Sequence, residues 1–245
     1  MSTTPHSHRI LSVRVHNAPY DLMLAAALEA AASTAPAFTT YSHFHILLDA
    51  RTQPWMRDVL DHASLNVADG IAVRAVLRFR GATRLATVNA TDFHHHLLDH
   101  CLRERRRVYL LGGSAAAAGR LPAILAARYP GCAVRTHDGS IRAEDSTVID
   151  DIRVFSPDVL FLGLGSPLQF EWLARNLERA GVPLTVAAGN FLEFLAGTRP
   201  RAPRWMQASR LEWLHRLAVE PSRLWRRYLL GAPRFFYHAL SDRKK

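Results

Sequence analysis

The feature that most constrains the fold of this chain is a regular alternation of short apolar runs and helical segments in its second half. Each run ends in glycine, and segments with helical spacing lie between the runs. The runs are VYLLGG at 108–113, CAVRTHDG at 132–139, VLFLGLG at 159–165 and VPLTVAAG at 182–189. Strands that alternate with helices in this way predict a parallel sheet covered on both faces. We therefore expect an α/β fold with a Rossmann-like parallel sheet flanked by helices.

The first half of the chain predicts shorter elements of the same kind. Residues 20–35 are rich in alanine and helical in character, and residues 38–41 form a short β-prone run. The segment LNVADGIAVRAVLRF at 65–79 passes from a short apolar strand into a helix, so Asp69 lies at a strand-to-helix junction. Residues 1–20 are polar with scattered valine and leucine, and they supply a candidate edge strand.

A further helix is predicted to begin near residue 91. Thr91 or Asp92 is a suitable N-cap, because the side-chain oxygens of both residue types accept hydrogen bonds from the first turn. The apolar stripe that should face the core consists of Phe93, Leu97, Leu98, Cys101 and Leu102. Cys101 and Cys132 are the two cysteines of the sequence, too few for a disulfide framework or a cysteine-based zinc site.

Histidines are frequent in this helix but do not match a metal motif. His96 and His100 are spaced i, i+4, as in some zinc sites, but no HExxH arrangement accompanies them. We therefore interpret the run His94–His96 as part of a solvated helix face. His43 and His45 stand at alternate positions near a predicted helix start, and we assign them no function.

Glycine-rich turns follow two of the predicted strands, at the sheet edge where ligands bind in open α/β folds. Gly112 and Gly113 could present backbone N–H groups to a phosphate at the next helix N-terminus, although the sequence does not match G-x-G-x-x-G. The segment GLGSPLQ at 163–169 adds Gly165 and Gln169 at the same edge. A tight strand-to-helix turn is the alternative for both segments.

Asp69 is the carboxylate that best fits a general base. Its predicted position at a strand-to-helix junction permits partial burial and an adjusted pKa. The alternative is an N-cap of the following helix, where aspartate is common. From the residues alone the N-cap interpretation is favoured.

The last fifth of the chain carries nearly all of the excess positive charge. Residues 199–245 contain ten arginines and two lysines against three acidic side chains, a net charge of +9 out of +10 for the whole chain. This segment is also rich in tryptophan, tyrosine and phenylalanine, and it predicts two or three short helices divided at Glu220-Pro221 and at 231–233. Such a composition fits helices packed on the domain, an anionic membrane surface, or nucleic acid.

The sequence resembles the WecG/TagA/CpsF family of bacterial glycosyltransferases over roughly residues 38–240. The pieces that match occur in the order of the family. They are Ala-Asp-Gly at 68–70, Thr91-Asp92, LLGG at 110–113, YPG at 129–131, HDG at 137–139, GLGSPLQ at 163–169 with Trp172, FLAG at 194–197, RAPRWM at 201–206, LEWLHRL at 211–217 and EPSRLWRRYLLGAPRF at 220–235. The ordered set is specific, and its C-terminal block is the strongest part.

The resemblance implies an inverting glycosyltransferase that uses a UDP-sugar donor, usually UDP-N-acetylmannosamine or a related compound. The implied acceptor is a polyprenyl-diphosphate-linked saccharide at the cytoplasmic face of the bacterial plasma membrane, in cell-surface or exopolysaccharide biosynthesis. The implied enzyme attaches peripherally to an anionic membrane and needs no cofactor, metal or nucleic acid; a homo-oligomer is compatible with it. Residues 1–198 would form the nucleotide-sugar-binding catalytic domain, and residues 199–245 a basic helical C-terminal appendage that contacts the membrane and the active site.

The resemblance also implies roles for individual residues. Asp69 matches the base that deprotonates the acceptor hydroxyl, and Thr40 belongs to the same catalytic group. The donor site would include Asn89, Gly112, Gly113, Asp138, Gly165, Gln169 and Glu193. The residues that contact the acceptor diphosphate or the membrane would be Arg216, Arg223, Arg226 and Arg227.

Four segments depart from the family pattern. The family's Thr-Leu-Asn is Thr40-Tyr41-Ser42 here, Arg-Val-Thr-Gly is 87–90 (TVNA), Pro-Lys-Gln-Glu is 167–170 (PLQF), and Phe-Asp-Phe is 192–194 (LEF). These changes raise an alternative: a catalytically degenerate relative that binds saccharide or acts as a scaffold at the membrane. Two features support a cytosolic chain. The N-terminus lacks the apolar core of a secretory signal, and the chain has no run of 18 uncharged apolar residues.

Overall fold

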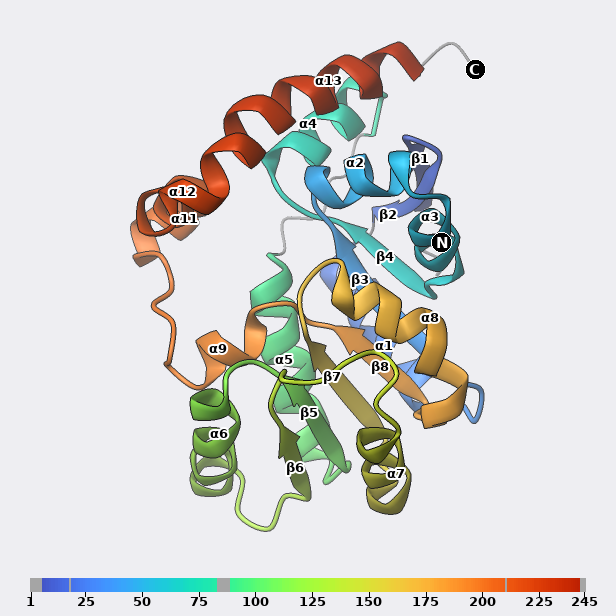
Figure 1. Cartoon of the computed structure of the whole chain (residues 1–245), viewed down its shortest axis with the longest axis vertical. Helices are drawn as coiled ribbons and strands as arrows, with labels where there is room; N and C mark the ends of the chain where they lie inside the picture. Colours follow the sequence, from blue (N-terminus) through green and yellow to red (C-terminus); the bar gives the residue numbers. More distant parts are fainter. Residues whose placement is uncertain (1–5, 18, 83–88, 210, 243–245) are drawn as a thin grey trace.

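The chain folds around one eight-stranded sheet, as the alternating pattern predicts (Figure 1). The structure is a computed structural model, and it describes residues 6–17, 19–82, 89–209 and 211–242. The strands lie in the order β1-β2-β4-β3-β8-β7-β5-β6, and every neighbouring pair is parallel except β1 with β2. Their bounds are β1 His6–Ile10, β2 Val13–Asn17, β3 Ala37–Ser42, β4 Leu65–Ala68, β5 Val108–Gly112, β6 Val134–His137, β7 Val159–Gly163 and β8 Leu184–Ala187. The α/β, Rossmann-like prediction is confirmed.

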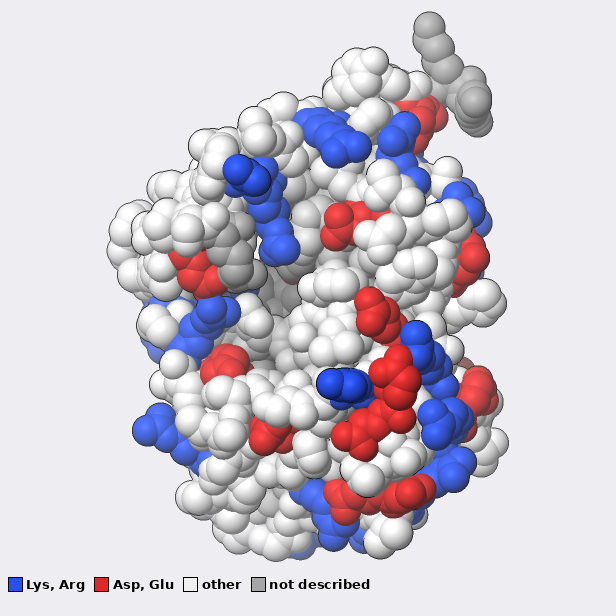
Figure 2. All heavy atoms as spheres, in the orientation of Figure 1, with Lys and Arg blue, Asp and Glu red and all other residues white. Residues whose placement is uncertain are grey.

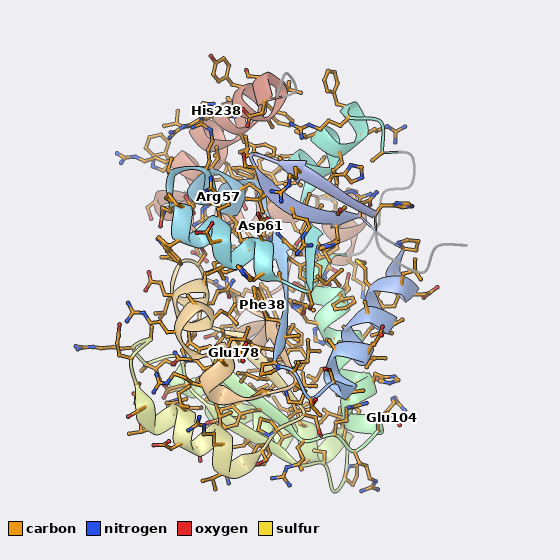
Figure 3. The ribbon with its side chains drawn as sticks, turned by 90° about the vertical axis from the view of Figure 1, so that its right-hand side faces the viewer. Phe38, Arg57, Asp61, Glu104, Glu178 and His238 are labelled. Atoms are coloured by element: carbon orange, nitrogen blue, oxygen red, sulfur yellow. The ribbon has the colours of Figure 1, made fainter. Side chains whose placement is uncertain are left out.

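The N-terminal segment forms a hairpin where we expected a single edge strand. Leu11 and Ser12 form its two-residue turn, and both have a positive φ, 51° and 68°. The carboxylate of Asp61, at the end of α3, accepts a 2.8 Å hydrogen bond from the backbone N–H of Arg14 and lies 3.2 Å from the guanidinium of Arg9 (Figure 3). The hairpin is thereby fixed to the helix layer and extends the sheet by an antiparallel strand.

Helices cover both faces of the sheet. One apolar core lies under α2 (Phe44–Thr52), α3 (Pro54–His62), α4 (Ile71–Phe79), α7 (Ser146–Phe155) and α8 (Leu168–Ala180). Phe38 of β3 points into this core and is 2% exposed (Figure 3). The other core lies under α1 (Tyr20–Ala32), α5 (Ala90–Arg103), α6 (Ala115–Arg128) and α9 (Phe191–Leu195). Because β5 and β7 are covered on both faces, their sequences are apolar almost throughout. The equally buried β3, β4 and β8 also carry polar side chains, namely Thr39, Thr40, Ser42, Asn66 and Thr185.

Two helix starts differ from the prediction. The side chain of Asn89 caps α5 by accepting a hydrogen bond from the Thr91 N–H, so the prediction of Thr91 or Asp92 as N-cap is wrong by two or three residues. The predicted apolar stripe of this helix is confirmed, since all five of its members are buried. The sequence pattern also predicts a helix over residues 143–155. In the structure Asp145 caps α7, which therefore begins at Ser146.

The C-terminal segment forms short helices, as expected, with one difference. They are α10 (Arg204–Ala208), α11 (Glu212–Val219), α12 (Pro221–Trp225), the π-helical turn η1 (Arg226–Leu230) and α13 (Gly231–Ser241). The predicted break at Glu220 is confirmed, because this residue leaves helical geometry with φ −130° and ψ 60°. The break predicted at 231–233 is wrong: Gly231 is helical, and Pro233 lies in the first turn of α13, where a missing N–H is tolerated.

The C-terminal helices run from the region of α9 across to α4, and α13 packs on α2 and α4 (Figure 1). Phe235 and Ala239 of α13 are fully buried in the same core as Phe44 of α2. The rings of Phe44 and Phe235 lie 6.0 Å apart. The division of the chain into residues 1–198 and 199–245 stays a prediction, and the packing of α13 adds that the two parts share a core. Among the described residues, no helix combines the length and the apolar character needed to cross a bilayer.

Candidate functional site

A cavity of about 110 Å³ lies between the C-terminal helices and the body of the protein. Its walls come from the start of α2, the segment around α9, residues 199–202, α11 and the junction of α12 with η1. Figure 2 shows a hollow in this region, with basic side chains at its rim. The basic side chains in its lining are Arg199, Arg201, Arg216 and Arg227, accompanied by His43, His45 and His215. Glu212 and Glu220 also line the cavity and pair with Arg201 and Arg199. Four arginines against two carboxylates still leave a net positive lining, which favours an anionic ligand.

Asp69 lies beside this cavity, at the junction of β4 and α4, and is 8% exposed. Its Oδ1 accepts a 2.7 Å hydrogen bond from the N–H of Gly70, and its Oδ2 lies 3.2 Å from Nε2 of His43. The N-cap position of α4 belongs to Gly70, which has a φ of +83°. The N-cap interpretation of Asp69 is therefore wrong, and the carboxylate faces His43.

Thr40 lies below the site, within β3. It is fully buried, it pairs in register with Asn66 of β4, and its hydroxyl has no hydrogen-bond partner among the described residues. Ser42, two residues further along the same face, donates a 2.7 Å hydrogen bond to Oδ1 of Asn66. Thr40 thus belongs to the polar layer of the sheet beneath the segment that leads to His43.

The predicted glycine turn after β5 is held by a glutamate from α9. The N–H of Ser114 donates a 2.6 Å hydrogen bond to Oε1 of Glu193, and the hydroxyl of Thr198 also bonds to this carboxylate. Burial opposes ionisation, but the hydrogen bonds from Thr198 and Ser114 hold the pKa of Glu193 below its usual value. Glu193 therefore occupies the N-terminus of α6 with its negative charge, the place where the sequence suggested a phosphate.

Gly112 is required by packing in this turn, and Gly113 by its backbone conformation, with a φ of +73°. A Cβ at Gly112 would stand 2.4 Å from the backbone carbon of Gly163, and the residue has a φ of +131°. A Cβ at Gly113 would stand 3.4 Å from Oε1 of Glu193. The tight-turn alternative accounts for both glycines without a ligand, and their role in donor binding stays a prediction.

The remaining predicted donor residues lie along the same sheet edge, after β6 and β7. Gly165 has a φ of +75°, and its carbonyl accepts a 2.8 Å hydrogen bond from the N–H of Gln169. Gln169 is 5% exposed, and its Oε1 has no partner among the described residues. The carboxylate of Asp138 accepts a 2.7 Å hydrogen bond from the N–H of Ser140, which lowers the pKa of Asp138.

Asn89 lies beside the C-terminal helices. Its side-chain amide donates a 2.7 Å hydrogen bond to Oε2 of Glu212 on α11. Arg201 lies 2.7 Å from Asp92 and 3.4 Å from Glu212, so it bridges the first turn of α5 and α11. These contacts bring Asn89 close to the basic cavity and connect the two predicted parts of the chain.

The four predicted arginines divide between two environments. Arg216 and Arg227 line the cavity, and the guanidinium of Arg216 lies over the ring of Phe194 at 5.7 Å. Arg226 is exposed and stacks on Trp225 at 5.2 Å. The side chain of Arg223 lies outside what the structure describes.

The histidines of the cavity and two of its arginines were not predicted as site residues. His43 and His45 received no function, although both line the cavity and their rings stack at 5.6 Å. The position of His43 in the sequence could have indicated its place in the site. His43 immediately follows β3 and Asp69 immediately follows β4, and these two strands are parallel neighbours. Arg199 was counted only in the charge of the tail, and Arg201 only there and in the RAPRWM segment of the family resemblance.

The solvated-face interpretation is wrong for His94. This side chain is 2% exposed and packs edge-on against Tyr41, Phe161 and Phe191. Burial lowers the pKa of His94 to about 3, with a smaller contribution from His95. The described residues contain no cluster of three or more histidine, cysteine or acidic side chains able to hold a metal ion.

Comparison with known proteins gives a family for the chain. The model of the glycosyl transferase WecG/TagA/CpsF family matches residues 8–245. A protein of Staphylococcus aureus (strain NCTC 8325 / PS 47) is 30% identical over 220 residues, which are 87% of this chain and 83% of the relative. That relative is named N-acetylglucosaminyldiphosphoundecaprenol N-acetyl-beta-D-mannosaminyltransferase. The protein of the same name from strain MRSA252 shows the same identity and coverage.

Proposed function

Because the chain belongs to the WecG/TagA/CpsF family of glycosyltransferases, we propose that it moves a sugar from a UDP-sugar to a polyprenyl-diphosphate-linked saccharide, with inversion at the anomeric centre. The observation that carries the proposal is the arginine-lined cavity beside the partly buried carboxylate of Asp69. The proposed donor carries N-acetylmannosamine or another hexose, in keeping with the names of the S. aureus relatives. The proposed context is cell-surface or exopolysaccharide assembly.

Attack by the acceptor and departure of UDP both create a charge that the protein must stabilise. The acceptor hydroxyl must lose a proton as it attacks, and we assign this base function to the site of Asp69, with Thr40 supporting it from within β3. The departing UDP gains negative charge, which Arg216 and Arg227 can neutralise from the cavity wall. Arg223 and Arg226 are the further candidates for the acceptor diphosphate or the membrane.

The donor site is proposed for the sheet edge formed by the ends of β5, β6 and β7. Ligands of parallel sheets bind beyond the carboxyl ends of the strands. The proposed donor residues are Asn89, Gly112, Gly113, Asp138, Gly165, Gln169 and Glu193. Oε1 of Gln169 has no hydrogen-bond partner among the described residues, so we propose that it accepts a hydrogen bond from such a ligand.

Membrane contact is proposed for the exposed side of the C-terminal helices, at the inner face of the bacterial plasma membrane. Trp225, Leu229 and Leu230 are 41%, 60% and 60% exposed. Arg226 stands among them and can meet anionic head groups. An arginine beside exposed tryptophan and leucine is typical of interfacial helices.

The test is nucleotide binding followed by transfer. Calorimetry should detect UDP and its sugars in preference to GDP, ADP and NAD, and UDP-N-acetylmannosamine should then support transfer to a synthetic polyprenyl-diphosphate saccharide. Asp69→Asn should reduce kcat by about 100-fold or more. The exposed Asp58→Asn is the matched control. Folded protein that binds no uridine nucleotide would favour the degenerate-scaffold alternative.

A further inference from the structure

Two neighbouring loops at the sheet edge bring a histidine and a carboxylate together. Strands β3 and β4 pair in parallel with Ser42 opposite Ala68, and His43 and Asp69 are the residues that follow. Nε2 of His43 lies 3.2 Å from Oδ2 of Asp69. The 2.7 Å hydrogen bond from the Gly70 N–H to Oδ1 fixes the carboxylate, so the contact with His43 has a defined direction.

The two side chains differ in their access to the cavity. The side chain of His43 is 34% exposed and that of Asp69 is 11% exposed. Among the described residues, those that line the cavity include His43 but not Asp69. A ligand in the cavity would therefore meet the imidazole first, with the carboxylate behind it.

The second ring nitrogen of His43 has no hydrogen-bond partner among the described residues, and the side chain as a whole is 34% exposed. An imidazole that directs Nε2 to the Asp69 carboxylate donates its ring hydrogen from Nε2, which leaves the lone pair of Nδ1 for a ligand. No described residue donates a hydrogen bond to Nδ1. A Cβ at position 70 would stand 3.2 Å from Nδ1, so the glycine at this position keeps the nitrogen uncovered.

Charged groups from several elements surround the imidazole. Asp69 follows β4, Glu212 and Arg216 lie on α11, Arg227 lies in η1, and the His45 ring of α2 stacks on His43. Burial lowers the pKa of His43, and the two arginines lower it further, while the two carboxylates raise it in part. The imidazole is thus neutral near pH 7 and able to accept a proton.

We propose that His43 and Asp69 form a dyad in which Nδ1 of His43 takes the proton of the acceptor hydroxyl and Asp69 is the positioning residue. The inference rests on the proposed function and divides its base function between two groups. The acceptor oxygen bonds to the anomeric carbon, the bond from that carbon to the UDP oxygen breaks, and its electron pair leaves with UDP. The proton moves to Nδ1, and the ionised carboxylate stabilises the resulting imidazolium.

The test combines His43 variants with the pH dependence of transfer by the full-length protein. His43→Ala should lower kcat by about 100-fold or more, while UDP affinity by calorimetry stays within about threefold, and added imidazole should restore part of the activity. His43→Gln should be equally slow, because its amide can hydrogen-bond to Asp69 but cannot accept the proton. The exposed His62→Ala on α3 is the control and should match the wild type.

The pH profiles separate the dyad from a carboxylate that acts alone. Wild-type kcat/KM should fall on the acid side with a midpoint below 6.5, and Asp69→Asn should move this midpoint to lower pH, because the carboxylate raises the pKa of His43. Either of two results would overturn the dyad and leave the proposed function standing. The first is a near-wild-type kcat in His43→Ala. The second is a His43→Ala variant that imidazole does not rescue and whose kcat/KM still falls on the acid side. A wild-type protein that transfers no sugar from any UDP-sugar would overturn the proposed function and the dyad with it.

Discussion

The side-chain amide of Asn89, the N-cap of α5, donates a 2.7 Å hydrogen bond to the carboxylate of Glu212 on α11. The same carboxylate lies 3.4 Å from Arg201, which also pairs with Asp92 at 2.7 Å. Glu212 is therefore the point at which α11 is tied to the body beside the basic cavity. Because its side chain is 17% exposed, water competes only partly with these contacts.

Removal of this carboxylate should loosen the C-terminal helices. Glu212→Ala removes the partner of the Asn89 side-chain amide and one of the two partners of Arg201, which keeps Asp92. Lost charge-assisted hydrogen bonds of this kind cost about 1.5 kcal/mol. If α11 opens locally, its amide hydrogens should exchange about tenfold faster. Hydrogen exchange followed by mass spectrometry measures this directly.

Glu178→Ala is the matched control, since Glu178 is exposed on α8 and does not belong to the described lining of the cavity (Figure 3). It should leave the exchange of α11 unchanged. Equal exchange in Glu212→Ala and the wild type would show that the apolar packing of α13 holds the C-terminal helices without this contact.

The turn after β5 should tolerate no side chain at Gly112. In Gly112→Ala the new methyl group meets the backbone of Gly163 at 2.4 Å, and the positive φ adds strain, so the free energy of unfolding should fall by about 3 kcal/mol. In Gly119→Ala, within α6, the methyl group has open space and helix propensity improves, so the same quantity should rise by up to about 1 kcal/mol. Urea unfolding compares the two variants; similar values for both would contradict the packing argument.

Much of this fold was predictable because its strands carry strong local signals. The apolar runs that became β5, β7 and β8 are bounded by glycine and proline, and each lies between helices, which specifies parallel strands. The order of strands was not predictable, because both neighbours of a doubly buried strand present similar apolar faces. The π-helical turn η1 was also missed, since 231–233 has the composition of a break while the packing of Phe235 keeps the chain helical.

The site was predictable only in part, for a related reason. Asp69 was located from the change of hydrophobic period at a strand-to-helix junction, a local property of the sequence. Its contact with His43 depends on the register of β3 against β4, which brings together residues 26 positions apart. Arg201 was missed because the bridge between Asp92 and Glu212 exists only once α11 is docked.

The exposed leucines of η1 should contribute to binding of anionic vesicles. Leu229→Ser combined with Leu230→Ser removes two apolar side chains that are each 60% exposed, and about 1 kcal/mol per side chain predicts roughly 30-fold weaker partitioning. Co-sedimentation with phosphatidylglycerol vesicles measures the change. Ile124→Ser, at a 39% exposed position of α6, should leave partitioning unaltered; an equal loss there would argue against a specific membrane face.

His94 should make the protein sensitive to acid. Burial lowers the pKa of His94 to about 3 in the folded state, whereas the unfolded chain has a histidine pKa near 6.5. Both states are neutral at pH 7, but below pH 6.5 the unfolded chain binds a proton that the folded protein excludes. Stability is therefore lost as the pH falls from 6.5 towards 3, and at pH 5 the cost is about 2 kcal/mol.

His94→Leu removes this linkage and should also relieve a burial penalty, since neither ring nitrogen has a partner among the described residues. Between pH 7 and pH 5, the free energy of unfolding of the variant should decrease by about 2 kcal/mol less than that of the wild type. Urea denaturation at the two pH values measures the difference. The exposed His96→Leu, on the same helix, should behave as the wild type. An unchanged acid response in His94→Leu would mean that His94 gains a proton in the folded state and that its aromatic surroundings admit water.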